Sequence, residues 1–390
     1  MQKGLKRLLS VTIIAALLLT GCGYYASLSS RSSGKLEPVT LNIATAGDID
    51  MMELQEKAVG KEFSQKYSDV VINVVGTGPG DSGSREIFAK LKAQKEENKK
   101  VWDIDVAIVH QSIMKEMMKE GLLEKYVPMS QNKKYVTSAD SVNSLGIDVD
   151  DYVIPMFHNQ VVLAYNPEQV KEVPYTFEQL VKWIQAHPRR FGYNGISNDM
   201  SGAAFVTAYT YWKSEDYKQL TEGPYDPKLE KKWPSILKEL KALPVIYTSG
   251  TEGTLDMLNR GDIDMGPVWV DMFSDWKAEG RMNLDLKMTV IAPGLPGQTM
   301  YVVIPKKAQN KEIAIKYADF LTSPEVQARV IVERNGWYPG IDANVTLAKV
   351  SEQGKTRLFS DITTEDLGKK SQSFPLQDYF NKLQIAYEKS

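Results

Sequence analysis

The chain has 390 residues, 47 of them basic and 49 acidic, so its net charge at neutral pH is −2. This balance argues against nucleic acid as a partner, because nucleic-acid binders carry an excess of basic residues. Cys22 is the only cysteine, which excludes an internal disulfide framework and a thiolate metal site. The length is enough for two lobes of ordinary size, each with its own core.

The first 21 residues have the order of an export signal. Three basic residues precede an uncharged apolar run from Leu8 to Leu19, which is too short to span a bilayer comfortably. The run closes with Leu19-Thr-Gly-Cys22, which resembles the lipobox of bacterial lipoproteins. The resemblance implies a signal peptide over residues 1–21 and a lipid on the sulfur of Cys22. The alternative interpretation is a buried free thiol in an ordinary core segment.

A lipid on Cys22 would anchor the protein to the cell membrane at its extracytoplasmic face. Removal of residues 1–21 takes away three basic residues, so the net charge of the mature chain becomes −5. Residues 22–37 are rich in Ser and Gly, and they predict a flexible tether between the lipid and the folded body.

From Val39 onward, strand-like and helix-like segments alternate. This alternation predicts a mainly parallel sheet flanked by helices, because parallel strands need a crossover connection. The predicted elements are a strand at 39–43, a helix at 52–67, a strand at 70–75, a helix at about 85–95, a strand at 104–109 and a helix that ends at 121. A loop rich in Gly and Ser is predicted between the second strand and the second helix.

The strand–helix alternation stops at 152–165, because two extended apolar stretches are joined there directly through Pro155–Gln160. Thr176 and Gln179 then form a capping box that predicts a helix start. Further helices are predicted at 201–212, 230–240 and 311–321, and strands at 245–247, 264–265, 286–291 and 300–304. The remainder, to residue 390, is predicted to be mostly helical.

Five stretches in this order resemble the extracellular solute-binding proteins of ABC importers, which have the type II periplasmic-binding-protein fold. They are Leu19–Cys22, Leu41–Thr45, Ile154–Asn166, Thr176–Leu180, and Tyr301–Asn310 with Ala318–Glu325. The resemblance implies an α/β fold of two lobes joined by a hinge of crossing strands. It places lobe one at 38–155 plus 286–322, lobe two at 156–285 plus 323–390, and the hinge near 155–160 and 293–300.

The same resemblance implies a small-molecule solute, an ABC permease as the membrane partner, no cofactor and no metal. Related clefts take sugars, polyamines, thiamine-like compounds or organic anions. The three histidines are scattered and no metalloprotease or nucleophile-elbow motif occurs. We therefore interpret the chain as a monomeric binding protein and not an enzyme. The alternatives are a surface-anchored sensor subunit and a cell-envelope hydrolase on the same fold.

Candidate ligand-binding residues follow the predicted strands, because ligands of open α/β sheets gather at the carboxyl ends of the strands. Loops after the first three strands contribute Thr45, Asp48, Gly78, Asp81, Ser82, Ser84, His110 and Gln111. The hydroxyls and free N–H groups of the Gly/Ser loop suit a carboxylate, phosphate or polyol. A plain turn with a helix cap is the alternative for that loop.

The crossover and lobe two supply the other candidates. Phe157, His158, Asn159 and Thr299 lie in the predicted hinge, where polar side chains can both donate and accept hydrogen bonds. Ser201, Trp269 and Asp271 lie near predicted helix starts in lobe two. We expect Trp269 to stack on the solute. A core role for Trp269, a helix-capping role for Asp271 and a structural hinge role for His158 stay open.

Overall fold

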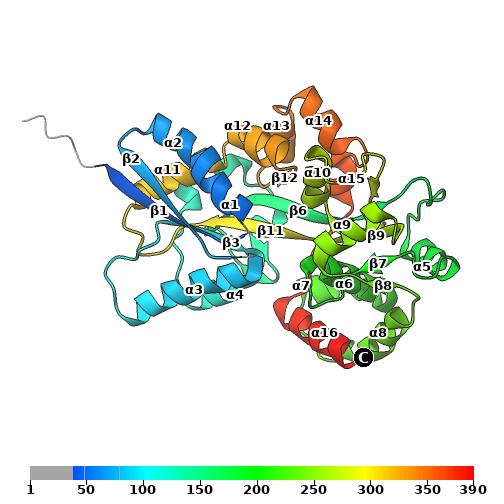
Figure 1. Ribbon diagram of the computed structural model, residues 1–390. Coiled ribbons are helices and arrows are strands. Elements are labelled where there is room, and N and C mark those ends of the chain that lie inside the picture. The colour runs from blue at the N-terminus through cyan, green and yellow to red at the C-terminus, as the bar shows by residue number, and fades with distance from the viewer. Residues whose placement is uncertain (1–37, 48, 79) are drawn as a thin grey trace, which may run out of the picture. The chain divides into compact units, whose positions relative to one another are not determined.

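The computed structural model describes residues 38–390 except 48 and 79 (Figure 1). The predicted signal peptide, Cys22, the tether and Asp48 lie outside the described residues. The chain from Pro38 on is a mixed α/β fold whose main sheet has nine strands, which confirms the predicted α/β class. The prediction of a mainly parallel sheet is wrong, because most strand pairings are antiparallel. Within the described ranges, no helix has both the length and the apolar character that crossing a membrane requires.

Three parallel strands form the first part of the sheet. β1 (Val39–Thr45) pairs with β2 (Val70–Gly76) on one side and β3 (Val106–His110) on the other. All five residues of β3 are buried, as expected of a central parallel strand. The helices around these strands are α1 (Ile49–Glu53), α2 (Lys61–Lys66), α3 (Gly80–Glu96), α4 (Met114–Lys119), α11 (Lys311–Leu321) and α12 (Pro324–Val326).

Two helices differ from their sequence-based predictions. The predicted helix at 52–67 is divided by a π-helical stretch, η1 (Leu54–Gly60), between α1 and α2. α3 begins at Gly80, so most of the predicted Gly/Ser loop is its first turn. The Ser84 hydroxyl donates to the Gly80 carbonyl at 2.7 Å, and the Thr77 hydroxyl donates to the Gly83 carbonyl at 2.9 Å. Both bonds lie within the segment that the sequence assigns to the loop.

Two strands run from this sheet into the other half of the chain (Figure 1). β6 (Val153–Tyr165) pairs antiparallel with β11 (Leu295–Val303) through residues 153–160 and with β9 (Met265–Trp269) through residues 161–165. β10 (Lys287–Thr289) pairs with the last three residues of β6. The only run of consecutive polar residues in β6 is His158–Gln160, at the middle of the strand. β6 and β11 therefore correspond to the crossing strands that the sequence predicts.

Separate apolar cores lie on the two sides of the crossing strands. The first core contains Leu41, Ile108 and Val302; the second contains Phe205 and Leu237; and the third contains Leu255, Phe273 and others. Separate cores are what a two-lobed fold requires. The helices beyond the crossing strands are α5 (Phe177–Ala186), α6 (Met200–Ser214), α7 (Tyr217–Glu222), α8 (Trp233–Lys241), α9 (Gly250–Arg260), α10 (Val270–Ala278), α14 (Glu352–Phe359), α15 (Thr364–Lys369) and α16 (Gln377–Lys389). α13 (Ala343–Leu347) contacts α12.

Short elements complete the described chain. The two-residue strands are β4 (Asn143–Ser144), β5 (Ile147–Asp148), β7 (Gly192–Tyr193), β8 (Ile246–Tyr247), β12 (Tyr338–Pro339) and β13 (Ser371–Gln372). The helical turns are η2 (Gln111–Ile113), η3 (Val127–Met129), η4 (Lys133–Tyr135), η5 (Ala139–Ser141) and η6 (Leu229–Lys232), and η7 (Gln327–Arg334) is π-helical. β12 pairs with β6, and β13 pairs with β11, so both lie beside the crossing strands.

The packing differs from the sequence-based lobe boundaries at two places. Val326, Val330 and Ile341 pack in the first core, although the sequence assigns 323–390 to lobe two. Met288 packs in the third core, although the sequence assigns 286–322 to lobe one. The division into lobes stays a proposal, and the apolar packing supports moving both segments.

Candidate functional site

A cavity of about 330 Å³ lies where β6 and β11 run side by side between the cores. Its walls come from the start of η2, from the turn at η5, from both crossing strands, and from β12, α15 and β13. Most of the lining side chains are polar. The lining residues are Gln111, Ser138, Ala139, Asp140, His158, Asn159, Gln160, Gly297, Gln298, Thr299, Tyr338, Leu367, Ser371, Gln372 and Ser373.

One wall of the cavity holds a hydrogen-bonded group of three side chains. The Thr299 hydroxyl donates to Asp140 Oδ2 at 2.5 Å, and His158 Nδ1 lies 3.0 Å from that hydroxyl and 3.3 Å from Asp140 Oδ2. Antiparallel pairing places His158 directly opposite Thr299. The backbone of Asp140 is fixed independently, because the buried Tyr301 hydroxyl donates to its carbonyl at 2.8 Å.

In this group, the Asp140 carboxylate and the His158 imidazolium each stabilise the charged form of the other. Burial by itself lowers the pKa of His158, but the Asp140 carboxylate and its hydrogen bond outweigh burial, so the pKa is raised. Burial by itself raises the pKa of Asp140, but the His158 charge and the surrounding hydrogen bonds lower that pKa well below its usual range. At neutral pH the carboxylate is therefore charged and offers an acceptor to the cavity.

Carboxamides dominate the rest of the lining. The Gln160 amide donates to the Leu295 carbonyl and accepts from the Ser371 hydroxyl at 2.6 Å. The buried Gln372 Oε1 atom has no hydrogen-bond partner among the described residues. A buried acceptor without a partner is costly, so this atom favours a ligand that donates a hydrogen bond.

Four of the sequence-predicted residues line this cavity together: Gln111, His158, Asn159 and Thr299. Sequence reasoning missed Asp140, which precedes the crossing strand by 13 residues and belongs to no motif. The short turn η5 and the Tyr301 bond bring Asp140 to the cavity. No local sequence signal predicts such a placement.

Most of the candidate ligand-binding residues in the loops after β1, β2 and β3 lie close together, and they form hydrogen bonds within this group. Thr45 is fully buried, and the Gly78 carbonyl accepts from the Gly47 N–H at 2.7 Å. The Ser84 hydroxyl accepts from the His110 N–H at 2.8 Å. These hydrogen bonds connect the ends of neighbouring strands, and none of these residues lines the cavity.

Asp81 belongs to the same hydrogen-bonded group. It accepts a hydrogen bond from the Ser112 hydroxyl, which lies 2.8 Å from His110 Nδ1. Burial lowers the pKa of His110 to about 4, although the Asp81 charge opposes this shift, so His110 is neutral at pH 7. Ser82 is exposed on the first turn of α3. A ligand role for these residues stays a prediction.

The candidates of lobe two also lie outside the cavity lining. Trp269 is 5% exposed within the second core, and its indole N–H donates to Asp199 Oδ1 at 3.4 Å. Asp199 is the N-cap of α6 and accepts from the Ser201 N–H at 3.0 Å. Ser201 is fully buried, with its hydroxyl 2.7 Å from that of Thr251. These contacts support the core alternative for Trp269.

Phe157 and Asp271 both contact Trp337, outside the cavity lining. The Phe157 ring stacks on Trp337, and the Trp337 indole N–H donates to Asp271 Oδ2 at 2.5 Å. Asp271 is not the helix cap, because Trp269 occupies the N-cap position of α10.

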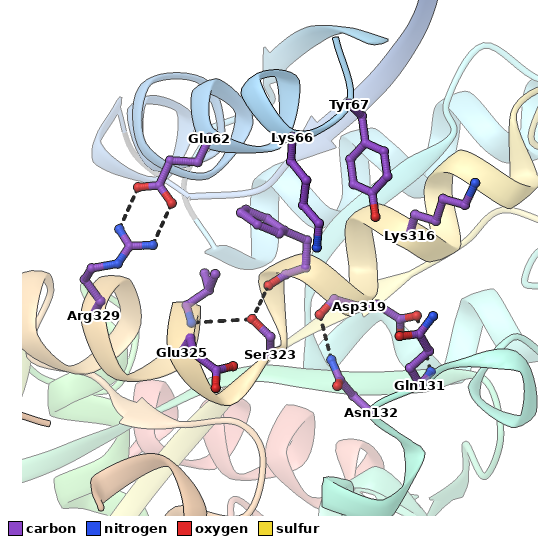
Figure 2. Close-up of a pocket in the computed structure, with 12 residues that line it drawn as sticks. Glu62, Lys66, Tyr67, Gln131, Asn132, Lys316, Asp319, Ser323, Glu325 and Arg329 are labelled. Atoms are coloured by element: carbon purple, nitrogen blue, oxygen red, sulfur yellow. Dashed lines mark hydrogen bonds and ion pairs between the residues drawn. The ribbon is translucent and has the colours of Figure 1, made fainter. Parts of the chain in front are cut away.

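A second hollow, of about 360 Å³, lies over α2, α11 and η7 (Figure 2). Figure 2 shows Glu62 facing Arg329, and both oxygens of Glu62 accept from the guanidinium at 2.6 Å. The Asp319 carbonyl accepts from Asn132 Nδ2 at 2.6 Å. None of the predicted site residues lines this hollow, and its walls belong to elements around the first core alone. Among the described residues, no cluster of three His, Cys, Asp or Glu side chains is arranged to hold a metal ion.

Comparisons with known proteins agree with the geometry. A family model described as "Bacterial extracellular solute-binding protein" matches residues 58–355. An ABC transporter structure from Clostridium perfringens is similar, with 18% identity, a TM-score of 0.66 and coverage of 90% of this chain and 99% of that one. Maltose-bound MalE3 of T. maritima is similar, with 15% identity, a TM-score of 0.68 and coverage of 90% and 95%. A solute-binding protein of Thermotoga lettingae with bound α-D-tagatose has 17% identity, a TM-score of 0.66 and coverage of 90% and 94%. No curated protein sequence matches.

Proposed function

Since the chain belongs to the bacterial extracellular solute-binding proteins, which bind small solutes for ABC transporters, we propose that the cavity between β6 and β11 holds its solute. The observation that carries this proposal is the lining. A ligand in the cavity touches both crossing strands, η5 beside the first core and Leu367 of the third core. Closure about the strands would thus be coupled to binding.

We infer that the solute is small, uncharged and rich in hydroxyl groups. The cavity volume of about 330 Å³ is near the lower end of the range for ligand pockets, ~300–1,000 Å³. No Lys or Arg lines the cavity, which disfavours an organic anion. Asp140 is the only lining carboxylate and already faces His158, which disfavours a polyamine. Carboxamides and the buried, unpartnered oxygens of Ser138, Asp140 and Gln372 among the described residues suit hydroxyl donors of a sugar or polyol.

Thermal-shift measurements on the full chain in detergent test this inference. The panel contains neutral monosaccharides and polyols, spermidine, thiamine and citrate. A true ligand at a hundredfold its dissociation constant adds about 2.7 kcal/mol to the free energy of unfolding. A shift with spermidine or citrate and none with the neutral compounds would contradict the solute class.

Two variants locate the site. Asp140→Asn keeps the shape of the cavity but removes its charge, and we expect about tenfold weaker binding from the loss of a charge-assisted hydrogen bond. Asp256→Asn is the matched control, because Asp256 is exposed on α9 and does not line the cavity. Equal affinity of both variants and the parent would show that the solute binds elsewhere.

We also propose that the protein acts as a monomer on the extracytoplasmic face of the membrane, held there by a lipid on Cys22. The family match supports the extracytoplasmic location. The order of charged, apolar and lipobox residues over 1–22 supports the anchor. The family's members bind solutes, which supports a binding role without catalysis.

A further inference from the structure

The crossing strand β6 presents different residues on its two faces. His158 and Tyr338 line the cavity, whereas Phe157 and Trp337 do not. The Phe157 and Trp337 rings stack with centroids 3.9 Å apart and planes 11° apart. β12 pairs with β6 so that Tyr338 lies opposite His158. The stacked rings therefore lie beside the cavity without forming part of its lining.

Trp337 contacts both sides of the crossing strands. It is 8% exposed and packs in the first core. Its indole N–H donates to Asp271 Oδ2 at 2.5 Å, in the first turn of α10, and Phe273 of α10 packs in the third core. The backbone next to Trp337 also lies close to α10. A Cβ atom on Gly336 would lie 3.8 Å from the Asp271 Cα atom.

We propose that Trp337 is a positioning residue whose hydrogen bond to Asp271 controls how readily the two halves move about β6 and β11. A hydrogen bond to a carboxylate in a buried setting is stronger than an ordinary hydrogen bond. A movement of α10 that takes Asp271 away from Trp337 breaks this bond, so the bond favours the arrangement in which it forms. Trp337 acts without lining the cavity, and this inference does not depend on the class of solute.

Another polar contact between the halves is weaker. Lys115 of α4 lies 2.8 Å from Asp378 of α16, but the two side chains are 41% and 57% exposed. Exposed ion pairs are screened by water and salt and contribute little. Removal of the buried indole bond is therefore expected to change hinge motion more than removal of this ion pair.

Amide hydrogen exchange on the full chain in detergent tests the proposal. Trp337→Phe keeps a ring on Phe157 but deletes the N–H donor. We expect exchange to rise about tenfold at residues 153–165 and 270–273, from the loss of one charge-assisted bond, and to stay unchanged at 106–110 in β3. Trp102→Phe is the matched control, because Trp102 is 2% exposed in the first core and its indole N–H has no partner among the described residues.

A second variant separates positioning from simple loss of core packing. Asp271→Asn keeps the side-chain shape and weakens the same bond, so exchange at residues 153–165 is expected to rise as well. The double variant should exchange no faster than the faster single variant, because both changes act on one bond. Unchanged hinge exchange in Asp271→Asn, additive effects, or an equal rise at residues 106–110 would each overturn the proposal.

Discussion

Replacing His158 with glutamine is expected to lower the free energy of unfolding by about 2 kcal/mol at pH 5.5. Removing one partner of a fully buried ion pair costs ~3–5 kcal/mol, whereas an exposed pair contributes ~0–1 kcal/mol. His158 and Asp140 lie between these limits, since their side chains are 25% and 24% exposed. Glutamine still supplies an N–H donor, but it cannot supply the positive charge beside Asp140.

The loss of unfolding free energy in His158→Gln should become smaller as the pH rises. The folded-state pKa of His158 is raised above its unfolded value. The charged pair therefore contributes its full stability below the unfolded pKa of about 6.5, and the contribution is lost as pH rises through the folded-state pKa. The difference in stability between parent and variant is expected to shrink at alkaline pH.

Urea unfolding of parent and variant at intervals from pH 5.5 to 9 measures this difference. His187→Gln is the control, because His187 is exposed at the end of α5 and its ring bonds to and stacks on Trp183 without an acidic partner in the described structure. A His158→Gln difference that stays constant across the whole range would refute a charged His158–Asp140 pair.

Two further predictions follow from the anchor and from the second core. Cys22→Ala should abolish labelling by a palmitate analogue in cells, and labelling equal to the parent would contradict the lipid anchor. Trp269→Ala should lower the free energy of unfolding by about 3–5 kcal/mol, because the side chain is 5% exposed in a packed core. A normal urea transition combined with loss of solute binding would instead show that Trp269 contacts the solute.

The sequence predicts the crossing strand well because its pattern is local. β6 is one long run of mostly apolar residues that is interrupted by His158–Gln160, and these polar residues lie where the strand passes between cores. The capping box at Thr176 is equally local, and its hydroxyl accepts from the Gln179 N–H at 3.2 Å.

The sequence does not predict contacts that depend on distant packing. Asp140 reaches the cavity through a turn and a bond to Tyr301, which is 161 residues away in the chain. Trp269 precedes a helix like a cleft residue, yet its neighbours in the second core cover it. The sequence predicts the start of α3 too late, because Gly and Ser residues favour loops and turns as readily as the first turn of a helix.

Two neighbouring residues of β6 take part in different contacts. His158 lines the cavity, so under the proposed function substitutions there are expected to change which molecule fits. Phe157, one residue earlier, stacks on Trp337 outside the cavity lining. Under the two proposals, relatives of this protein can therefore change in affinity while their selectivity stays constant, through substitutions that a comparison of binding pockets alone would overlook.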